Sequence, residues 1–254
     1  MAKAQTIDQV KKYIHAIELP GIDPNRSSKS RGPSLVLADD VPSAAVNAGS
    51  LTSFVSGISK VHKSDVLNST LLAQLAANKQ FNRFTQTMDW YDYYISVLSN
   101  VGWVVPAFAF RDYSPSGTSL DLSVAILDIL GAIATGDEVA ILKATLSSLN
   151  AKPDNENALT LFDQQSFPEN LGTFQIFPVG EDDGQVVMAL SAMQFRSEKH
   201  VTRFLWFSWT QTSVQLKQSA QKAVLNEEIY GRVRSDVIEK LGSRAEDFIK
   251  NIEI

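Results

Sequence analysis

The feature that most constrains this chain is a change in the spacing of its apolar residues at Gly172. Before that point apolar side chains recur every three or four positions, as on helices; after it they largely alternate, as on strands. Helices therefore come first and strands follow as a block, which predicts the α+β class rather than alternating α/β. We expect an antiparallel sheet meander of about four to six strands in the C-terminal half, packed by amphipathic helices.

Two β-rich runs flank Asp183-Gly184, a pair typical of a tight hairpin turn. The stretch 201–218 that follows predicts one long extended strand. In it the segment FLWFSW places Phe204 and Trp206 on one face and Trp209 on the other. A strand that is apolar on both faces must be covered on both faces, either by protein or by a ligand.

The helical part predicts several amphipathic segments, and their boundaries follow from capping residues. One further run, WVVPAFAF, contains Pro106 and predicts an edge or bent strand. A short strand is expected over 34–41, and no assignment is made for 43–58. The first expected helix has Ile7, Val10, Ile14 and Ile17 on one face, and the last is capped by Asn226 with Ile229, Val233, Val237, Ile238 and Leu241 facing inward. Between them we expect one helix that begins at Ser64-Asp65, one from Thr87 to Gly102, a buried one over 120–135, one over 139–149 and a short one near 157–163.

Residues 1–254 are expected to form a single domain with a mobile linker near 20–33, where Pro, Gly, Ser and basic residues are frequent. The N-terminus has no apolar region of a Sec-type signal peptide. The longest near-apolar runs, 103–110 and 125–134, fall short of the roughly 20 residues of a membrane-spanning helix. These features predict a soluble protein, released or secreted by a non-classical route if at all.

Composition excludes several functions. A formal charge of −5 argues against a broad electrostatic grip on nucleic acid. The chain has no cysteine, so it has neither a thiolate metal site nor a Cys nucleophile. GxGxxG, GxxxxGK[ST] and GxSxG motifs are absent, and His15, His62 and His200 lie far apart. No catalytic residue, metal or cofactor is predicted.

The aromatic residues are unevenly distributed, because every tryptophan lies in one of two short regions. Tryptophan and tyrosine favour positions between apolar and aqueous surroundings, so these regions are candidates for contact with lipid or a partner. The simpler interpretation is that they are core. The candidate binding residues are Trp90, Tyr94, Trp103, Phe108, Phe204, Trp206 and Trp209.

Three segments give the chain a resemblance to a known group of proteins: WYDYYISVLSNVGWVV, AILDILGAIATGDE, and FLWFSW followed by the helix at Asn226. With these segments the chain resembles bacterial virulence and insect-active proteins of the Erwinia virulence factor type and, more loosely, Cyt-like toxins. The resemblance implies a non-enzymatic protein that acts on host membranes or the host gut. The virulence-factor type is associated with an acyl chain on a cysteine, and without cysteine any lipid must bind here non-covalently.

Three functional hypotheses follow. The first is a toxin-like or virulence-type protein that engages lipid or membrane through the aromatic site. The second is a hydrolase-type enzyme with a dispersed acid/base site, for which a pocket with convergent polar groups and a perturbed acid would be the sign. The third is a binding module that forms a homo-oligomer through the same aromatic surface.

Overall fold

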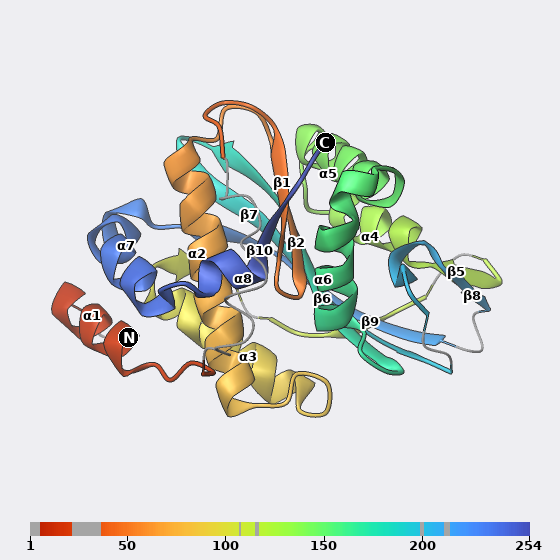
Figure 1. Cartoon of the computed structure of the whole chain (residues 1–254), viewed down its shortest axis with the longest axis horizontal. Helices are drawn as coiled ribbons and strands as arrows, with labels where there is room; N and C mark the ends of the chain where they lie inside the picture. The colour runs from red at the N-terminus through yellow and green to blue at the C-terminus, as the bar shows by residue number, and fades with distance from the viewer. Residues whose placement is uncertain (1–5, 22–36, 107, 115–116, 199–200, 211–213) are drawn as a thin grey trace.

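The computed structural model describes all residues except 1–5, 22–36, 107, 115–116, 199–200 and 211–213 (Figure 1). In the described part an eight-stranded, mostly antiparallel sheet lies between two layers of helices, which confirms the α+β class. The expected strand number was too low, because short strands from the N-terminal half and the C-terminal end join the sheet. Its strands run in the order β10 (Ile249–Ile252), β1 (Ser43–Asn47), β2 (Ser50–Phe54), β6 (Leu171–Asp182), β7 (Gln185–Ser197), β9 (Val214–Leu225) and β3 (Trp103–Val104), with β4 (Arg111–Tyr113) also paired to β9.

The centre of the sheet is the predicted hairpin of β6 and β7. Asp183 and Gly184, at its tip, have φ angles of 49° and 76°, the left-handed conformation that a type I′ turn requires at both central residues. The unassigned segment 43–58 contains a second hairpin, β1–β2. Strand β2 pairs in parallel with β6, so the sheet is not the pure antiparallel meander that the sequence predicts.

The outer edge of β9 carries two short strands, β3 and β4. Val104 pairs with Val224, and Arg111 pairs with Gln218. The chain from Val104 to Arg111 is therefore one residue longer than the part of β9, from Gln218 to Val224, that it lies beside. An extra residue of this kind is a bulge. Pro106, which has no N–H to donate to a ladder, lies in the interruption. The expected edge strand over 103–110 is thus confirmed only for Trp103–Val104.

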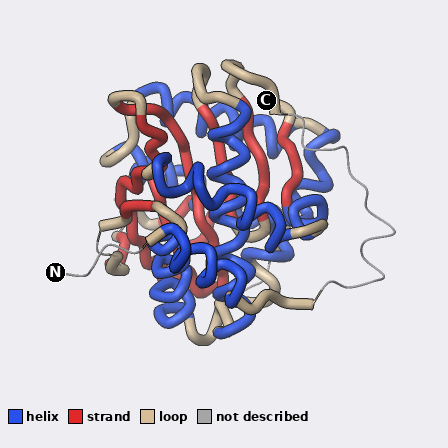
Figure 2. The backbone as a smooth tube through the Cα atoms, turned by 90° about the vertical axis from the view of Figure 1, so that its left-hand side faces the viewer, coloured by secondary structure: helices blue, strands red, loops and turns tan. Residues whose placement is uncertain are grey.

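The first layer of helices covers one face of the sheet (Figures 1 and 2). Thr6 forms a capping box for its first helix, and Asn226 caps the helix after β9 as predicted. The second helix begins at Ser59, which accepts from the His62 N–H, and not at Ser64-Asp65. The layer consists of α1 (Ile7–Ala16), α2 (Lys60–Gln80), α3 (Thr87–Asn100), α7 (Glu227–Leu241) and the short α8 (Arg244–Phe248).

The second layer covers the opposite face. The buried helix predicted over 120–135 is shorter, because residue 121 belongs to a strand and its carboxylate caps the helix by accepting from Ser123 and Val124. The layer consists of α4 (Leu122–Gly131), α5 (Gly136–Ala151), the 3-10 helix η1 (Pro153–Asn155), α6 (Glu156–Ser166) and the 3-10 helix η2 (Phe204–Trp206), beside a two-stranded sheet of β5 (Ser119–Asp121) and β8 (Ser208–Thr210).

The long strand predicted over 201–218 is wrong. Arg203 has a left-handed φ of 55°, and the chain turns there into η2 before β8 and β9 form two separate strands. Phe204 and Leu205 are consecutive yet both fully buried in the same core, which a strand does not permit because its side chains alternate between faces. The prediction that the buried helix lies near this segment is confirmed, since α4 contacts η2.

Three smaller expectations also differ from the structure. Residues 37–41 form no strand, and the rest of the segment expected as a strand lies outside the described residues. Ile238 on α7 does not face inward but is half exposed. The predicted linker lies, from residue 22 onward, outside the described part of the chain.

Candidate functional site

The first group of predicted aromatic residues belongs to the first layer. Trp90 and Tyr94 on α3 are fully buried, with their rings stacked at 5.2 Å between centroids. Trp103 on β3 is also buried, and its indole N–H donates to the Ser69 hydroxyl at 2.9 Å. Phe108 is partly buried against this core and stacks on Tyr91 at 5.5 Å. These four predicted residues share one apolar core.

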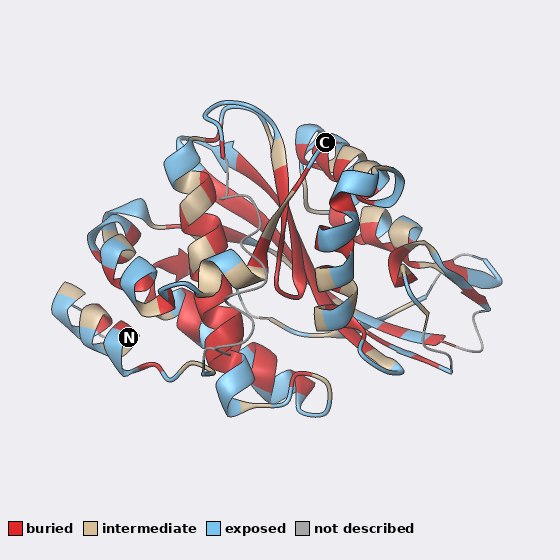
Figure 3. Ribbon diagram, viewed as in Figure 1, coloured by how far each residue is buried: buried red, intermediate tan, exposed pale blue. Residues whose placement is uncertain are grey.

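The second group lies under the second layer. Phe204 is fully buried and stacks on Phe162 and Phe195 at 5.7 and 5.4 Å. Trp209 on β8 contacts Phe195 at 5.6 Å and is 4% exposed, whereas Trp206 is partly buried. The sheet separates this group from the first. The seven residues therefore form two sites rather than one, and each is covered by helices (Figure 3).

The interfaces on the two faces of the sheet differ in polarity. Residues that pair across neighbouring strands point to the same face of the sheet, so the strand register assigns each strand side chain to one of the two faces. The face toward the second layer buries three polar strand residues, all serines: Ser53, Ser191 and Ser197. The face toward the first layer buries six, four of them larger than serine: Asn47, Ser50, Thr52, Thr173, Gln175 and Ser219.

Helix α2 meets this polar face with polar residues of its own. The Asn47 amide donates to the Thr70 hydroxyl and to the Leu67 carbonyl, both at 2.9 Å. The Gln74 amide donates to the Asn47 carbonyl at 3.0 Å and to the Ser50 hydroxyl at 3.2 Å. The first layer is thus attached to the sheet by buried hydrogen bonds as well as by apolar contacts.

At one end of this interface lies Arg83, which sequence reasoning missed. Its side chain is 5% exposed; one guanidinium nitrogen donates to the Gly49 carbonyl at 3.1 Å and to the Gln175 amide oxygen at 2.6 Å. The guanidinium carbon lies 4.7 Å from the centre of the Trp90 ring. Burial lowers the pKa of Arg83, and the neighbouring Tyr91 offsets part of this. Among the described residues no carboxylate forms an ion pair with it.

Gly49 makes room for this arginine. A Cβ atom at that position would overlap the guanidinium group, so only glycine allows the observed packing. No sequence pattern identifies Arg83 as buried, because its surroundings, FNRFTQ, have the polarity of an exposed turn between two helices.

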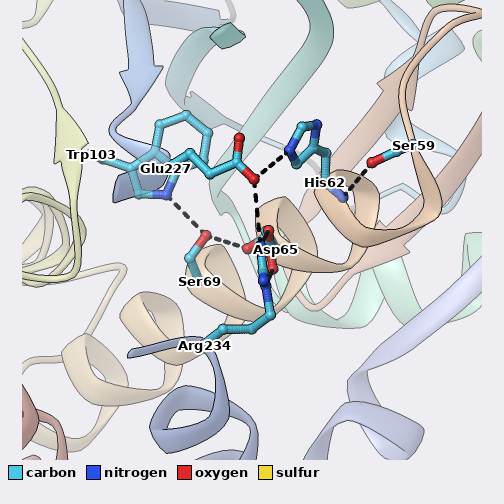
Figure 4. A network of polar contacts seen from close by, with 7 residues as sticks. All are labelled: Ser59, His62, Asp65, Ser69, Trp103, Glu227 and Arg234. Atoms are coloured by element: carbon cyan, nitrogen blue, oxygen red, sulfur yellow. Dashed lines mark hydrogen bonds and ion pairs between the residues drawn. The ribbon is translucent and has the colours of Figure 1, made fainter. Parts of the chain in front are cut away.

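A second polar network joins α2 to α7 (Figure 4). Arg234 donates through two nitrogens to the two oxygens of Asp65, both at 2.7 Å. His62 contacts Glu227 at 2.9 Å between the ring nitrogen and the carboxylate. Burial raises the pKa of Asp65 even though Arg234 favours its charged form. The bidentate pair places a buried carboxylate at the centre of the network.

This network contains a hydroxyl, a histidine and two carboxylates, but their contacts do not form a catalytic relay. The Ser69 hydroxyl donates to the carbonyl of Asp65 at 2.6 Å and accepts from Trp103. A nucleophile needs a base within hydrogen-bond reach, whereas this hydroxyl is bound to the backbone of its own helix. The network acts as a clamp between α2, α7 and β3.

A cavity of about 440 Å³ beside α6 is lined by apolar and charged residues, including Phe167. Its charged groups bind one another: Arg203 pairs with Glu156 at 2.5 Å, and its backbone N–H donates to Asp163 at 2.7 Å. The charged side chains that line this cavity are thus held in an ion pair and a backbone hydrogen bond.

Within the described ranges, no three His, Asp or Glu side chains gather as they would around a metal ion. None of the helices described there has both the length and the apolar character needed to cross a bilayer.

Comparison with known proteins gives structural likeness at low sequence identity. No protein-family model and no curated protein sequence matches the chain. It is similar to a solved delta-endotoxin, with 14% identity, a TM-score of 0.41 and coverage of 82% of this chain and 90% of the other. It is also similar to the activated Cyt2Ba monomer from Bacillus thuringiensis subsp. israelensis (12% identity, TM-score 0.42, coverage 68% and 96%) and to the Evf virulence factor (11%, 0.38, coverage 93% and 87%). These are the two kinds of protein that the sequence resembles.

Proposed function

We propose that this protein is a non-enzymatic, toxin-like or virulence-type protein that engages lipid membranes, and that it does so by moving its first layer of helices away from the sheet. The observation that carries this proposal is the difference between the two sheet interfaces. The first interface buries polar groups on both of its sides and joins them by hydrogen bonds between α2 and the sheet. The second buries fewer: serines on the sheet side and four polar residues of α5, η1 and α6 on the helix side.

Polarity decides which interface separates at the lower cost. Exposing apolar surface to water costs about 25 cal/mol per Å², whereas a buried amide or hydroxyl regains hydrogen bonds to water when it is exposed. Several side-chain atoms at the first interface have no partner in the closed form, among them Thr173 Oγ1 and Tyr94 Oη. Hydration of these atoms favours the open form.

The remaining cost of opening lies with the apolar side of the first layer, and a bilayer can cover that side. Trp90 and Tyr94 belong to this layer, and Trp103, on the edge strand β3, packs against it. Their rings are of the kind that lies at the level of lipid headgroups. Lipid contact by this group therefore offsets part of the cost of exposing it, and the sheet face that it leaves presents polar side chains to water beside its apolar ones.

Liposome flotation and dye release, at neutral and at acidic pH, test membrane engagement directly. The four tryptophans then identify the layer, because two lie in each core. W206F/W209F leaves Trp90 and Trp103 as the reporters, and W90F/W103F leaves Trp206 and Trp209. With brominated lipid we expect quenching in the first variant and little in the second.

Absence of both flotation and leakage at every pH would rule out the proposal. If only the W90F/W103F variant is quenched, Trp206 and Trp209 contact the lipid, and the second layer rather than the first engages the membrane. Light scattering on the purified protein is the control for the homo-oligomer hypothesis, since a stable dimer would also change how the aromatic groups are covered.

A further inference from the structure

We propose that Arg83 is the receptor for a phosphate-type anion, presented when the first layer opens, and that the phosphate of an anionic phospholipid is its ligand. This inference rests on the proposed function and names the lipid chemistry that the same layer selects. It begins from an unusual state: a guanidinium buried to 5% exposure whose hydrogen-bond acceptors are all neutral.

A buried cation without a carboxylate is costly. Taking a charged group out of water costs several kcal/mol unless an opposite charge compensates it. The bonds to Gly49 and Gln175 and the ring of Trp90 compensate only in part, because none of them carries a net charge. Opening of the first layer releases Arg83 from these neutral partners, and its charge is then available to an anion.

The guanidinium also keeps free donor capacity. Of its five N–H groups, those of one terminal nitrogen bind Gly49 and Gln175, and the Nε atom has no partner. The hydroxyl of Tyr94, on α3 of the same layer, is likewise unpartnered in the closed form. Donors of this kind match the several acceptor oxygens of a phosphate, and arginine binds phosphate in a bidentate manner.

The position of Arg83 favours a lipid source for that phosphate. The aromatic rings next to it are Trp90, which it faces, and Tyr91, which stacks on Phe108. When such rings enter the headgroup region of a bilayer, an arginine beside them lies at the level of the phosphates.

The net charge of the protein makes a preference for anionic lipid informative. At −5 the protein is repelled by an anionic surface as a whole. A preference for anionic lipid must therefore come from a particular cation rather than from general attraction.

The test measures partition of the wild type onto phosphatidylcholine vesicles with and without a fraction of phosphatidylglycerol, alongside R83M, R83K and R232M. Arg232 is the matched control because it is an exposed arginine of the same layer. We expect wild type to prefer the phosphatidylglycerol vesicles. R83M should lose about tenfold or more of its binding to them, as expected for a charge-assisted hydrogen bond, and should change little on phosphatidylcholine. R232M should behave as wild type.

Competition with inorganic phosphate tests whether Arg83 recognises the phosphate group itself or only the membrane that carries it. At matched ionic strength it should reduce wild-type binding to phosphatidylglycerol vesicles more than chloride does, and it should not affect the residual binding of R83M. Equal reduction by both salts would contradict a phosphate receptor.

Two results would overturn the inference while leaving the proposed function intact: wild-type binding that is independent of phosphatidylglycerol, or equal losses in R83M and R232M. Failure to bind any vesicle would overturn the proposed function itself. If R83M does not fold, the wild-type lipid comparison still decides, and R83K, which keeps the charge but not the planar fork, should keep part of the preference.

Discussion

The two layers of helices cover the same sheet but are attached to it in different ways. The second layer packs phenylalanines from α6, η2 and the strands into one another. The first layer buries an arginine, amides and hydroxyls between helix and sheet. Such buried polar groups add little net stability, because each gives up its bonds to water. In the proposed function, this difference makes the first layer the one that opens.

The largest expected effect is in the second layer. Phe204→Ala removes a fully buried ring that contacts Phe162, Phe174 and Phe195. Loss of apolar contact together with the cavity left behind should lower the free energy of unfolding by about 3–5 kcal/mol. Urea denaturation measures this. A loss below about 1 kcal/mol would mean that the second core is loosely packed, and the comparison would fail.

The clamp of the first layer should respond asymmetrically. Arg234→Met leaves the buried Asp65 carboxylate without its partner and should cost about 3 kcal/mol. Asp65→Asn should cost less than half of that, because the amide is neutral and Arg234, whose side chain is 30% exposed, can turn toward water.

The sign of the pH dependence checks this account. Burial raises the pKa of Asp65, so the folded protein holds this proton more tightly than the unfolded chain does. The resulting contribution to the free energy of unfolding is fully present below the ordinary carboxyl pKa and is lost as the pH rises. The R234M defect should therefore shrink as the pH is lowered from neutral toward about 4. A defect that stays constant with pH would contradict an unpaired carboxylate.

Two glycines give a matched comparison of the layers. A Cβ at Gly172 would overlap the Phe195 ring in the second core, and a Cβ at Gly49 would overlap the Arg83 guanidinium in the first. Gly172→Ala should cost about 1–3 kcal/mol, since a packed ring cannot give way. Gly49→Ala should cost less, because the end of a long side chain can move. Equal losses in urea denaturation would argue against a more adaptable first layer.

An unpartnered hydroxyl should be dispensable. Thr173→Val removes a fully buried oxygen without a hydrogen bond and keeps the shape of the side chain, so we expect a gain of up to about 1 kcal/mol. Thr145→Val in α5 is the control, because its hydroxyl donates to the Ile141 carbonyl at 2.8 Å and its loss should not stabilise. Thermal unfolding compares the two. Destabilisation by T173V would indicate a partner for Thr173 in solution.

The smallest effect concerns the contact of α1 with α7. Burial alone would raise the pKa of Asp236, but the hydrogen bond from His15 and the charge of Lys11 outweigh it and lower the pKa. Its contribution to stability is therefore present above about pH 4 and is lost as the pH falls further. Asp236→Asn should cost less than about 1 kcal/mol at neutral pH and nothing in acid, by urea denaturation at both pH values.

Local signals predicted much of this fold. Asp183-Gly184 specifies its turn by backbone conformation alone, and Asn226 caps its helix through a contact three residues away. The α+β class followed from the periodicity. Such features depend on neighbours in sequence, which is why the sequence suffices.

Other features depend on distant contacts. FLWFSW has the composition of a strand but folds into a 3-10 turn, because Phe204 and Leu205 both bury in one core. Of the candidate site, the aromatic clusters were identified, but not their separation by the sheet. Arg83 gave no signal, since its partners Gly49 and Gln175 are far away in the sequence.

The pairing of β10 with β1 has a consequence for the order of events in folding. Ile249–Ile252 closes an edge formed by Ser43–Asn47, about two hundred residues earlier in the chain. Contacts of such long range form late and slow folding. During synthesis the outer edge of β1 therefore stays unpaired until residue 252 has left the ribosome, and an unpaired edge is a site where a growing chain can associate with others. Once Ile249–Ile252 has paired, the edge of the sheet moves from the five residues of β1 to the four residues of β10.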